Sequence, residues 1–180
     1  MDAVIKTATM KTAAVETGEF AKTSPYTELY LHPGQTYISE EPVQISMILG
    51  SCAGVCLYDR RQAIGGATHY MLPQWEGPGS PSTRYGDIAL DVLLKQFQIH
   101  GSNPKDLEVK VFGGACMFQA FRAENGSEDH IGSRNINMAI QTFSQLGIFI
   151  AARDTGGENG RKIKMQSDTG SVAVSVIRNS

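Results

Sequence analysis

The stretch of residues 47–59 constrains the fold more than any other part of the sequence, because a few small residues separate two apolar runs there. The run that leads into it alternates apolar and polar side chains, which is typical of a strand with one buried face. Gly50-Ser51-Cys52 then predicts a turn. The chain continues as strand patterns at residues 55–58 and 63–71 with a short polar connection. Three strands joined by short turns predict antiparallel pairing.

Apolar residues at helical spacing predict two amphipathic helices. One covers residues 84–100 and ends at Gly101, and the other runs from Ile136 to Leu146 and ends at Gly147. Glycine is common just after the last helical turn. Shorter strand patterns complete the chain, at residues 29–31, 107–111 and 148–152 and on both sides of a turn at 168–170. We therefore expect an α+β domain in which two helices cover a strand-rich core.

The composition indicates one globular domain preceded by an arm. A chain of 180 residues with 41% hydrophobic and 19% charged residues is ordinary for a single domain. Residues 1–24 are rich in Ala, Thr and Lys, so we expect a mobile arm there and the folded domain over residues 25–180. The net charge of -2 disfavours nucleic acid or an anionic lipid surface as the main partner. We find neither an apolar run of about 18 residues for a membrane span nor a secretory signal.

Cys52 and His69 carry the chemistry that the residue pattern suggests. A free cysteine has a pKa near 8.5, so only about 3% is thiolate at pH 7 and the thiol needs activation. His69 lies on a strand that follows the turn, and its imidazole is able to take the proton. Gly50 permits unusual backbone dihedral angles at the turn, Ser51 and Ala53 leave room for a substrate, and the backbone N–H groups of the turn would stabilise an oxyanion. We expect the three cysteines to be free thiols in a reducing cytoplasm.

The same residues allow structural alternatives. Cysteine is among the most buried residue types, and a strand histidine is commonly part of the core. Cys116, which follows Gly113-Gly114-Ala115, is a rival nucleophile without an obvious base, whereas Cys56 lies inside a strand and is expected to pack in the core. A zinc site would need four ligands around one centre. Cys52, Cys56, Cys116 and His69 lack a second closely spaced pair, so we expect no metal.

Ser46 lies on the strand that leads to the turn, six residues before Cys52. Its hydroxyl could orient the imidazole by accepting the second ring N–H, as the third group of a catalytic triad does. Equally, it could be the polar side of an alternating strand. The other histidines, His32, His100 and His130, are expected at the surface.

Several short segments match those of a known family in the right order, over about residue 27 to the end of the chain. They are Leu49-Gly50-Ser51-Cys52, Val55-Cys56-Leu57-Tyr58-Asp59, Thr68-His69-Tyr70-Met71-Leu72-Pro73, Arg84-Tyr85-Gly86-Asp87, Phe112-Gly113-Gly114-Ala115, Ile131-Gly132-Ser133-Arg134-Asn135, Asp154-Thr155-Gly156-Gly157 and Gly160-Arg161. In these segments the chain resembles CheD, the chemoreceptor glutamine deamidase of bacterial and archaeal chemotaxis.

This resemblance implies a protein-glutamine deamidase that converts receptor glutamines to glutamates through a cysteine thioester, without metal or cofactor. Cys52 would be the nucleophile and His69 the general base and acid. Ser46 stands where the family commonly has a threonine that orients the histidine. The implied fold is a β-sandwich-like, largely antiparallel core flanked by helices, similar to toxin-type cysteine deamidases.

The resemblance also implies partners and location. Methyl-accepting chemotaxis receptors would be the protein substrate and a CheC-type phosphatase a further partner, and the protein would act in the cytoplasm at receptor arrays. For Trp75, in the glycine- and proline-rich loop after His69, our hypothesis is that it forms part of the wall that receives the receptor helix; equally, it could cap the core. Two alternatives stay open: a non-enzymatic adaptor that binds receptor or phosphatase, and an unrelated cysteine peptidase.

Overall fold

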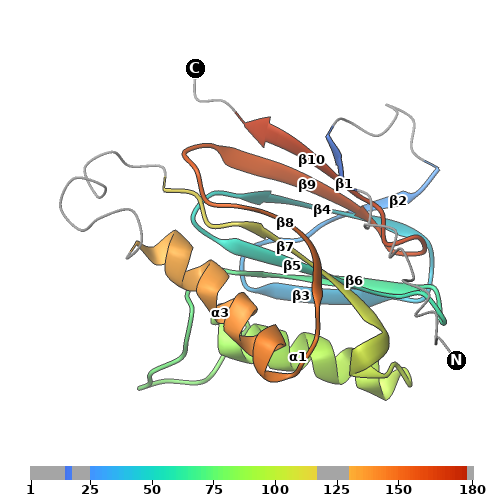
Figure 1. Ribbon diagram of the computed structural model, residues 1–180, viewed down its shortest axis with the longest axis horizontal. Helices are drawn as coiled ribbons and strands as arrows, with labels where there is room; N and C mark the ends of the chain where they lie inside the picture. The colour runs from blue at the N-terminus through green and yellow to red at the C-terminus, as the bar shows by residue number, and fades with distance from the viewer. Residues whose placement is uncertain (1–14, 18–24, 117–129, 178–180) are drawn as a thin grey trace, which may run out of the picture.

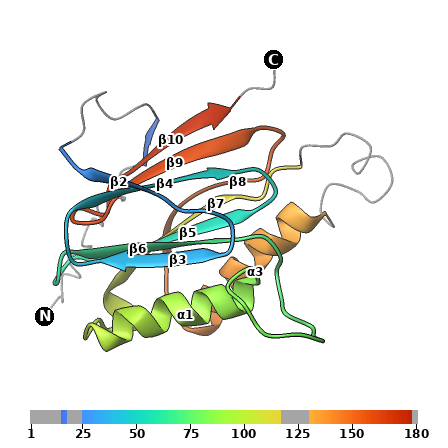
Figure 2. The ribbon, with the colours of Figure 1, turned by 180° about the vertical axis from the view of Figure 1, so that it is seen from behind.

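The computed structural model describes residues 15–17, 25–116 and 130–177. Within these ranges the chain forms ten strands, arranged as two five-stranded sheets that lie face to face. Two α-helices cover the outer face of one sheet (Figures 1 and 2). The structure therefore has three layers, and the predicted α+β fold with a β-sandwich-like core is confirmed.

The first sheet has the strand order β1-β10-β9-β4-β2. Its strands are β1 (Val15–Thr17), β2 (Thr27–Tyr30), β4 (Val43–Leu49), β9 (Gly160–Gln166) and β10 (Val172–Ile177). The three central strands pair antiparallel, whereas the edge strands β1 and β2 pair parallel with their neighbours. Strand β1 falls within the predicted N-terminal arm, so these three residues are held by β10. The remainder of the arm lies outside the described residues.

The second sheet has the strand order β3-β6-β5-β7-β8. Its strands are β3 (Gln35–Ser39), β5 (Ala53–Asp59), β6 (Ile64–Tyr70), β7 (Leu107–Gly113) and β8 (Ile150–Thr155). All neighbours pair antiparallel except β7 and β8. Helices α1 (Gly86–Ile99) and α3 (Ile131–Gln145) pack on this sheet, and the short 3-10 helix η1 (Pro104–Asp106) leads into β7.

Two apolar clusters fill the spaces between the layers. The cluster between the sheets includes Ile45, Met47, Leu49, Phe112 and Ile163. The cluster between the second sheet and the helices includes Val55, Leu57, Tyr70, Leu93, Phe97 and Phe143. Because the second sheet is covered on both faces, every residue of β5 and β6 is buried.

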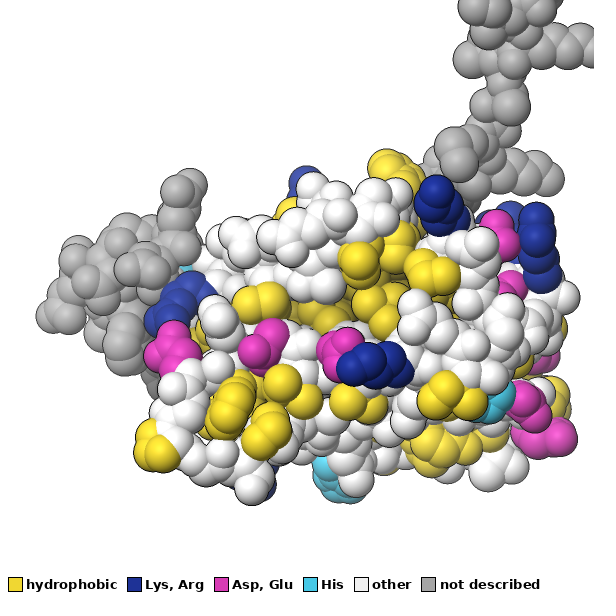
Figure 3. Space-filling model, turned by 90° about the horizontal axis from the view of Figure 1, so that it is seen from below, with side chains coloured by type: hydrophobic (Ala, Val, Ile, Leu, Met, Phe, Trp, Pro, Cys, Tyr) yellow, Lys and Arg dark blue, Asp and Glu magenta, His cyan; other side chains and the backbone are white. Residues whose placement is uncertain are grey.

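The outer surface of the helix layer is mixed in character. Seen from this side, apolar side chains lie among acidic and basic ones (Figure 3). The large apolar side chains that stay exposed include Ile99, Leu146 and Phe149. Among the residues that the structure describes, neither helix is long and apolar enough to cross a membrane.

The pairing predicted for the three strands around the cysteine turn is wrong in one respect. Strands β5 and β6 form the expected antiparallel hairpin, but β4 belongs to the other sheet. The reason is that β4 alternates and has one largely buried face, whereas β5 is buried on both faces and therefore lies inside a covered sheet. The turn at Gly50-Ser51-Cys52 thus carries the chain from one sheet to the other.

Two other elements differ from the prediction. Strand β3 is not predicted, because it lies at a sheet edge where most of its side chains are only partly buried and show no clear apolar alternation. Helix α3 begins earlier than the predicted Ile136, since the side chain of His130 accepts hydrogen bonds from the N–H groups of Gly132 and Ser133 and caps the helix. His130 is therefore a helix cap rather than a simple surface residue.

Replacing Phe97 with alanine should destabilise the fold by about 3–5 kcal/mol, because this side chain of α1 is fully buried in the cluster beneath the second sheet. The matched control is Ile99→Ala on the same helix, where the side chain is 81% exposed and the expected change is below about 0.5 kcal/mol. Chemical denaturation followed by circular dichroism measures both free energies of unfolding. Equal losses in the two variants would contradict the packing of α1.

Candidate active site

The cysteine turn between β4 and β5 is fixed through its backbone carbonyl groups. The N–H of Ala115 donates to the carbonyl of Gly50, and the N–H of Gly114 donates to the carbonyl of Cys52, both at 2.8 Å. Gly113, which precedes them, has φ +100°, and a Cβ there would collide with the Cys52 carbonyl oxygen. Only glycine allows the end of β7 to approach the turn this closely.

The remaining carbonyl of the turn, that of Ser51, is bound by a side chain. Asn135 of helix α3 is fully buried, and its Nδ2 donates to the Ser51 carbonyl at 2.9 Å. The same Nδ2 donates to the carbonyl of Met71, at the end of β6, at 2.8 Å. All three carbonyls of the turn are therefore directed into the protein.

A buried arginine supports the strand end that holds the turn. Arg161 is 7% exposed. Its Nε pairs with Asp154 at 2.8 Å, and its Nη2 donates to the carbonyl of Gly156 at 2.8 Å. Gly156 in turn donates its N–H to the carbonyl of Gly113 at 2.9 Å. The arginine thus fixes the segment that begins at residue 113 and contacts the cysteine turn.

His69 lies on β6 and is 1% exposed. Its Nδ1 is 3.1 Å from the carbonyl oxygen of Leu31. A carbonyl can only accept, so Nδ1 carries the proton and Nε2 is left with a free lone pair. Among the described residues, the buried Nε2 has no hydrogen-bond partner. This is the form of imidazole that a general base requires.

The strand register directs Cys52 and His69 to the same side of the second sheet. Gly54 lies directly opposite His69 in the β5–β6 pair. Cys52 stands two residues before Gly54, and side chains two residues apart share a face. Such diagonal neighbours lie within reach of long side chains. Gly54 has no side chain of its own, and the side chains of Met47 and Leu49 from β4 fill the space over it, where a Cβ would collide with both.

Burial changes the proton affinity of both groups. Burial raises the pKa of the Cys52 thiol above its ordinary value, although a hydrogen bond from its own backbone N–H opposes this shift. Burial lowers the pKa of His69, opposed by the hydrogen bond to the Leu31 carbonyl. A protonated thiol and a neutral imidazole are therefore the resting forms at neutral pH, and not a thiolate–imidazolium pair.

Ser46 contributes differently from the direct contact that the sequence suggests. Its hydroxyl donates to the carbonyl of Leu29 at 3.4 Å, and the described partner of His69 Nδ1 is Leu31. The physical reason is strand alternation, because Ile45 and Met47 turn inward and Ser46 faces outward. The backbone carbonyl of Ser46 accepts the N–H of Leu31 at 2.8 Å. Ser46 is thus linked to the histidine through Leu31, whose N–H donates to Ser46 and whose carbonyl oxygen contacts His69 Nδ1.

The other two cysteines have different environments. Cys56 is 1% exposed in β5, and burial raises its pKa to about 12. Cys116 is 9% exposed, and its backbone N–H donates to the carbonyl of Gly157. In the part of the chain that the structure describes, no group of three or more His, Cys, Asp or Glu side chains is placed to hold a metal.

The remaining predicted site residues differ in how exposed they are to solvent. Gly50 and Ser51 are partly exposed, whereas Ala53 is fully buried at the start of β5 between β6 and β7. Trp75 is partly buried in the loop after β6, where its backbone N–H donates to the carboxylate of Asp87 at 3.2 Å. The accessible part of the turn is therefore Gly50-Ser51-Cys52.

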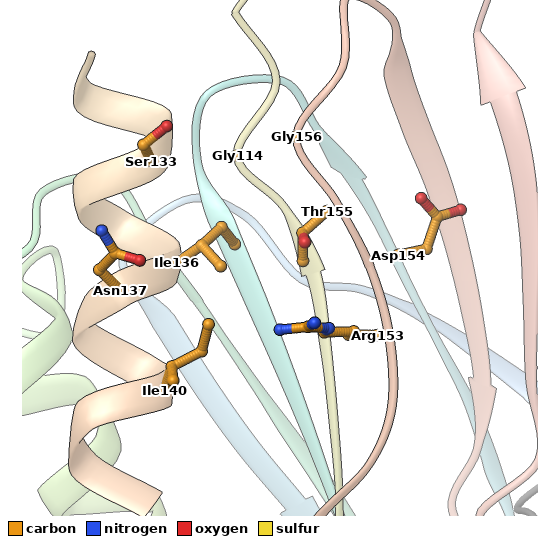
Figure 4. Close-up of a pocket in the computed structure, with 9 residues that line it drawn as sticks. All are labelled: Gly114, Ser133, Ile136, Asn137, Ile140, Arg153, Asp154, Thr155 and Gly156. Carbon is orange, nitrogen blue, oxygen red and sulfur yellow. The ribbon is translucent and has the colours of Figure 1, made fainter. Parts of the chain in front are cut away.

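A cavity of about 570 Å³ opens between α3 and β8 (Figure 4). Ile136 lines it from the helix, and Arg153 points toward the helix from the strand. Asp154 points to the opposite side, where it pairs with Arg161. Neither candidate catalytic residue lines this cavity, although Gly114 at its border donates to the Cys52 carbonyl.

Sequence reasoning assigns no role to Asn135, Arg161 or Leu31. Asn135 and Arg161 lie in segments that match those of the family, and this match is the feature of the sequence from which their importance could have been predicted. Leu31 acts through its backbone carbonyl, which carries no signal in a sequence.

Comparison of the sequence with known proteins identifies a family and several similar proteins. The model of the family CheD, described as CheD chemotactic sensory transduction, matches residues 71–176. A protein of Sulfurimonas denitrificans is 38% identical over 153 residues, which is 85% of this chain and 96% of the relative. One of Trichlorobacter lovleyi is 40% identical over 149 residues, covering 83% of this chain and 90% of the relative. Both are named probable chemoreceptor glutamine deamidase CheD.

The likeness extends to archaea and includes the cysteine turn. A Thermococcus kodakarensis protein of the same name is 39% identical over 134 residues, with 73% of this chain and 81% of the relative covered. The family match begins at Met71, after both candidate catalytic residues. A match over 153 residues in a chain of 180, however, necessarily includes Cys52 and His69. This protein therefore belongs to the CheD family.

Proposed function

We propose that this protein is a chemoreceptor glutamine deamidase with Cys52 as nucleophile and His69 as general base and acid. The observation that carries the proposal is the buried Nε2 of His69, which has a free lone pair and no partner among the described residues. It lies on the same side of the sheet as Cys52. The names of the relatives support the reaction type.

The reaction starts with the neutral pair. As Cys52 Sγ attacks the side-chain carbonyl carbon of glutamine, Nε2 of His69 takes the thiol proton. The tetrahedral intermediate collapses when the imidazolium gives this proton to the departing amine, so ammonia leaves and a thioester remains. His69 then deprotonates a water molecule that hydrolyses the thioester, which yields glutamate and the free thiol. General acid–base catalysis of this kind is worth about 10²–10⁴-fold.

The turn would supply the oxyanion site. Its three carbonyls accept hydrogen bonds from the protein interior, so they do not face the developing negative charge. The N–H groups of the partly exposed Gly50-Ser51-Cys52 are the donors available to the substrate oxygen. Donors that are fixed before the reaction stabilise an oxyanion without reorganising.

The substrate would be a glutamine on a chemoreceptor, reached at the protein surface. Met71 and Leu72, which follow the histidine strand, are each 39% exposed and offer apolar contact beside the site. We assign Trp75 to the wall that receives the receptor helix. A CheC-type phosphatase is a further partner in this proposal, and the location is the cytoplasmic receptor array.

A second candidate function is that of an adaptor that binds receptors or phosphatase without turnover. It is favoured by the resting state of the site, because burial keeps the Cys52 thiol protonated and the Ser46 hydroxyl bonds to Leu29. Incubation with purified receptor separates the candidates. A deamidase increases the receptor mass by about one dalton per glutamine, an adaptor leaves the mass unchanged, and a peptidase cleaves the backbone.

Variants of the site should lose deamidation in a graded order. Cys52→Ala should abolish the mass increase with little loss of stability, because the thiol is partly exposed. His69→Ala should lower kcat by about 10²–10⁴-fold. Ser46→Ala should lower kcat by less than about 3-fold, because Ser46 supports Leu31 through its backbone. Activity in Cys52→Ala would transfer the nucleophile role to Cys116, and equal losses for Ser46 and His69 would contradict the indirect role of Ser46.

The pH dependence should follow the neutral histidine. Burial lowers the pKa of His69, so its base form persists as the pH falls, and kcat/KM should decline only below about pH 6.5, the ordinary pKa of histidine. Burial raises the pKa of Cys52, so its alkylation by iodoacetamide should accelerate with a midpoint above about pH 8.5. An acid limb centred above pH 6.5, or alkylation independent of pH, would contradict the neutral pair.

A further inference from the structure

Asn135 lies where the pairing between the nucleophile strand and the histidine strand ends. The last residue pair of β5 and β6 is Ala53–Tyr70. Beyond it the strand ladder stops, and the next residues on the two strands are Cys52 and Met71. A hydrogen bond that joins these two segments beyond the last strand pair therefore fixes the position of the proposed nucleophile relative to the strand that carries the proposed base.

The side chain of Asn135 supplies that connection. Its Nδ2 donates to the Ser51 carbonyl at 2.9 Å and to the Met71 carbonyl at 2.8 Å. An amide nitrogen carries two hydrogens in a planar fork and can serve both acceptors at once. One buried side chain thus bridges the cysteine turn and the end of β6.

Asn135 is itself held in place. Its backbone carbonyl accepts the hydroxyl of Tyr70 at 2.6 Å, and both residues are fully buried. Tyr70 directly follows His69 on β6. The start of α3 lies at the same end of the molecule as the β4–β5 turn (Figures 1 and 2). The bridge is therefore anchored to the histidine strand through two separate hydrogen bonds.

We propose that Asn135 is a positioning residue of the deamidase, which sets the cysteine turn relative to the histidine strand. This inference rests on the proposed function. Asn135 is fully buried, so it does not contact substrate, and its loss should lower kcat and leave KM almost unchanged. Without the amide, the Ser51 and Met71 carbonyls lose the donor that joins them, so they stay unpaired beside the turn or the turn changes its backbone conformation and no longer holds its N–H groups in place for the sulfur. Both consequences disfavour the thiolate.

The test compares Asn135→Ala with two controls in the full-length protein. Asn137→Ala changes an exposed asparagine of the same helix. Phe143→Leu destabilises α3 at a buried position away from the turn. All variants are assayed well below their melting temperatures, for receptor deamidation and for the pH profile of iodoacetamide alkylation at Cys52. Peptide mass spectrometry assigns the alkylated cysteine.

We expect Asn135→Ala to lower kcat by about 10- to 100-fold with KM within about twofold, and to shift the alkylation midpoint upward by at least about half a pH unit. Both controls should retain the wild-type midpoint. An unchanged midpoint in Asn135→Ala, or the same shift in Phe143→Leu, would overturn the proposal.

Asn135→Leu covers the case in which the alanine variant does not fold, because it nearly keeps the side-chain volume, adds no buried charge and removes the amide donors. The same losses are expected, and a wild-type midpoint in this variant would also refute the positioning role. Alkylation does not require turnover. If the wild-type protein fails to deamidate receptors, the proposed function fails, while the alkylation profiles still decide the role of Asn135.

Discussion

The hydrogen bonds that hold the carbonyl groups of Gly50, Ser51 and Cys52 are the interactions on which the site depends. They come from the end of β7 and from α3, which are far from the turn in the chain. A turn fixed in this way keeps its backbone geometry, so a reaction there would need no further ordering of the turn. The pair of the buried Arg161 with the partly exposed Asp154 supports the segment that holds the turn.

Burial decides the chemistry as well as the fold. The second sheet lies between the other sheet and the helices, so His69 is almost fully buried on one of its inner strands. Burial lowers the pKa of the imidazole and so favours its neutral form, and the Leu31 carbonyl selects the tautomer with a free Nε2. Cys52, at the rim where the chain passes from one sheet to the other, remains partly exposed. The arrangement combines a buried histidine with a partly exposed cysteine, as the proposed roles of base and nucleophile require.

Family membership is predictable from the sequence because short segments preserve backbone requirements. Gly113 must approach the Cys52 carbonyl, and Asn135 must bind two carbonyls, so each position accepts few residue types. The resemblance to CheD is therefore visible in the sequence of these short segments, and the similar proteins confirm that the chain belongs to this family. The sequence does not reveal why these positions matter, because the contacts join residues separated by more than 60 positions, such as Ser51 with Asn135 and Met71 with Asn135.

The sequence alone determined the two helices, most of the strands and the candidate pair of Cys52 and His69, because local periodicity and residue chemistry are sufficient for these. Only the tertiary structure decided that β4 and β5 lie in different sheets, since pairing depends on which faces the rest of the chain covers. It also decided the partner of His69. A backbone carbonyl at Leu31 performs the orienting contact, and a carbonyl has no residue type by which a sequence could identify it.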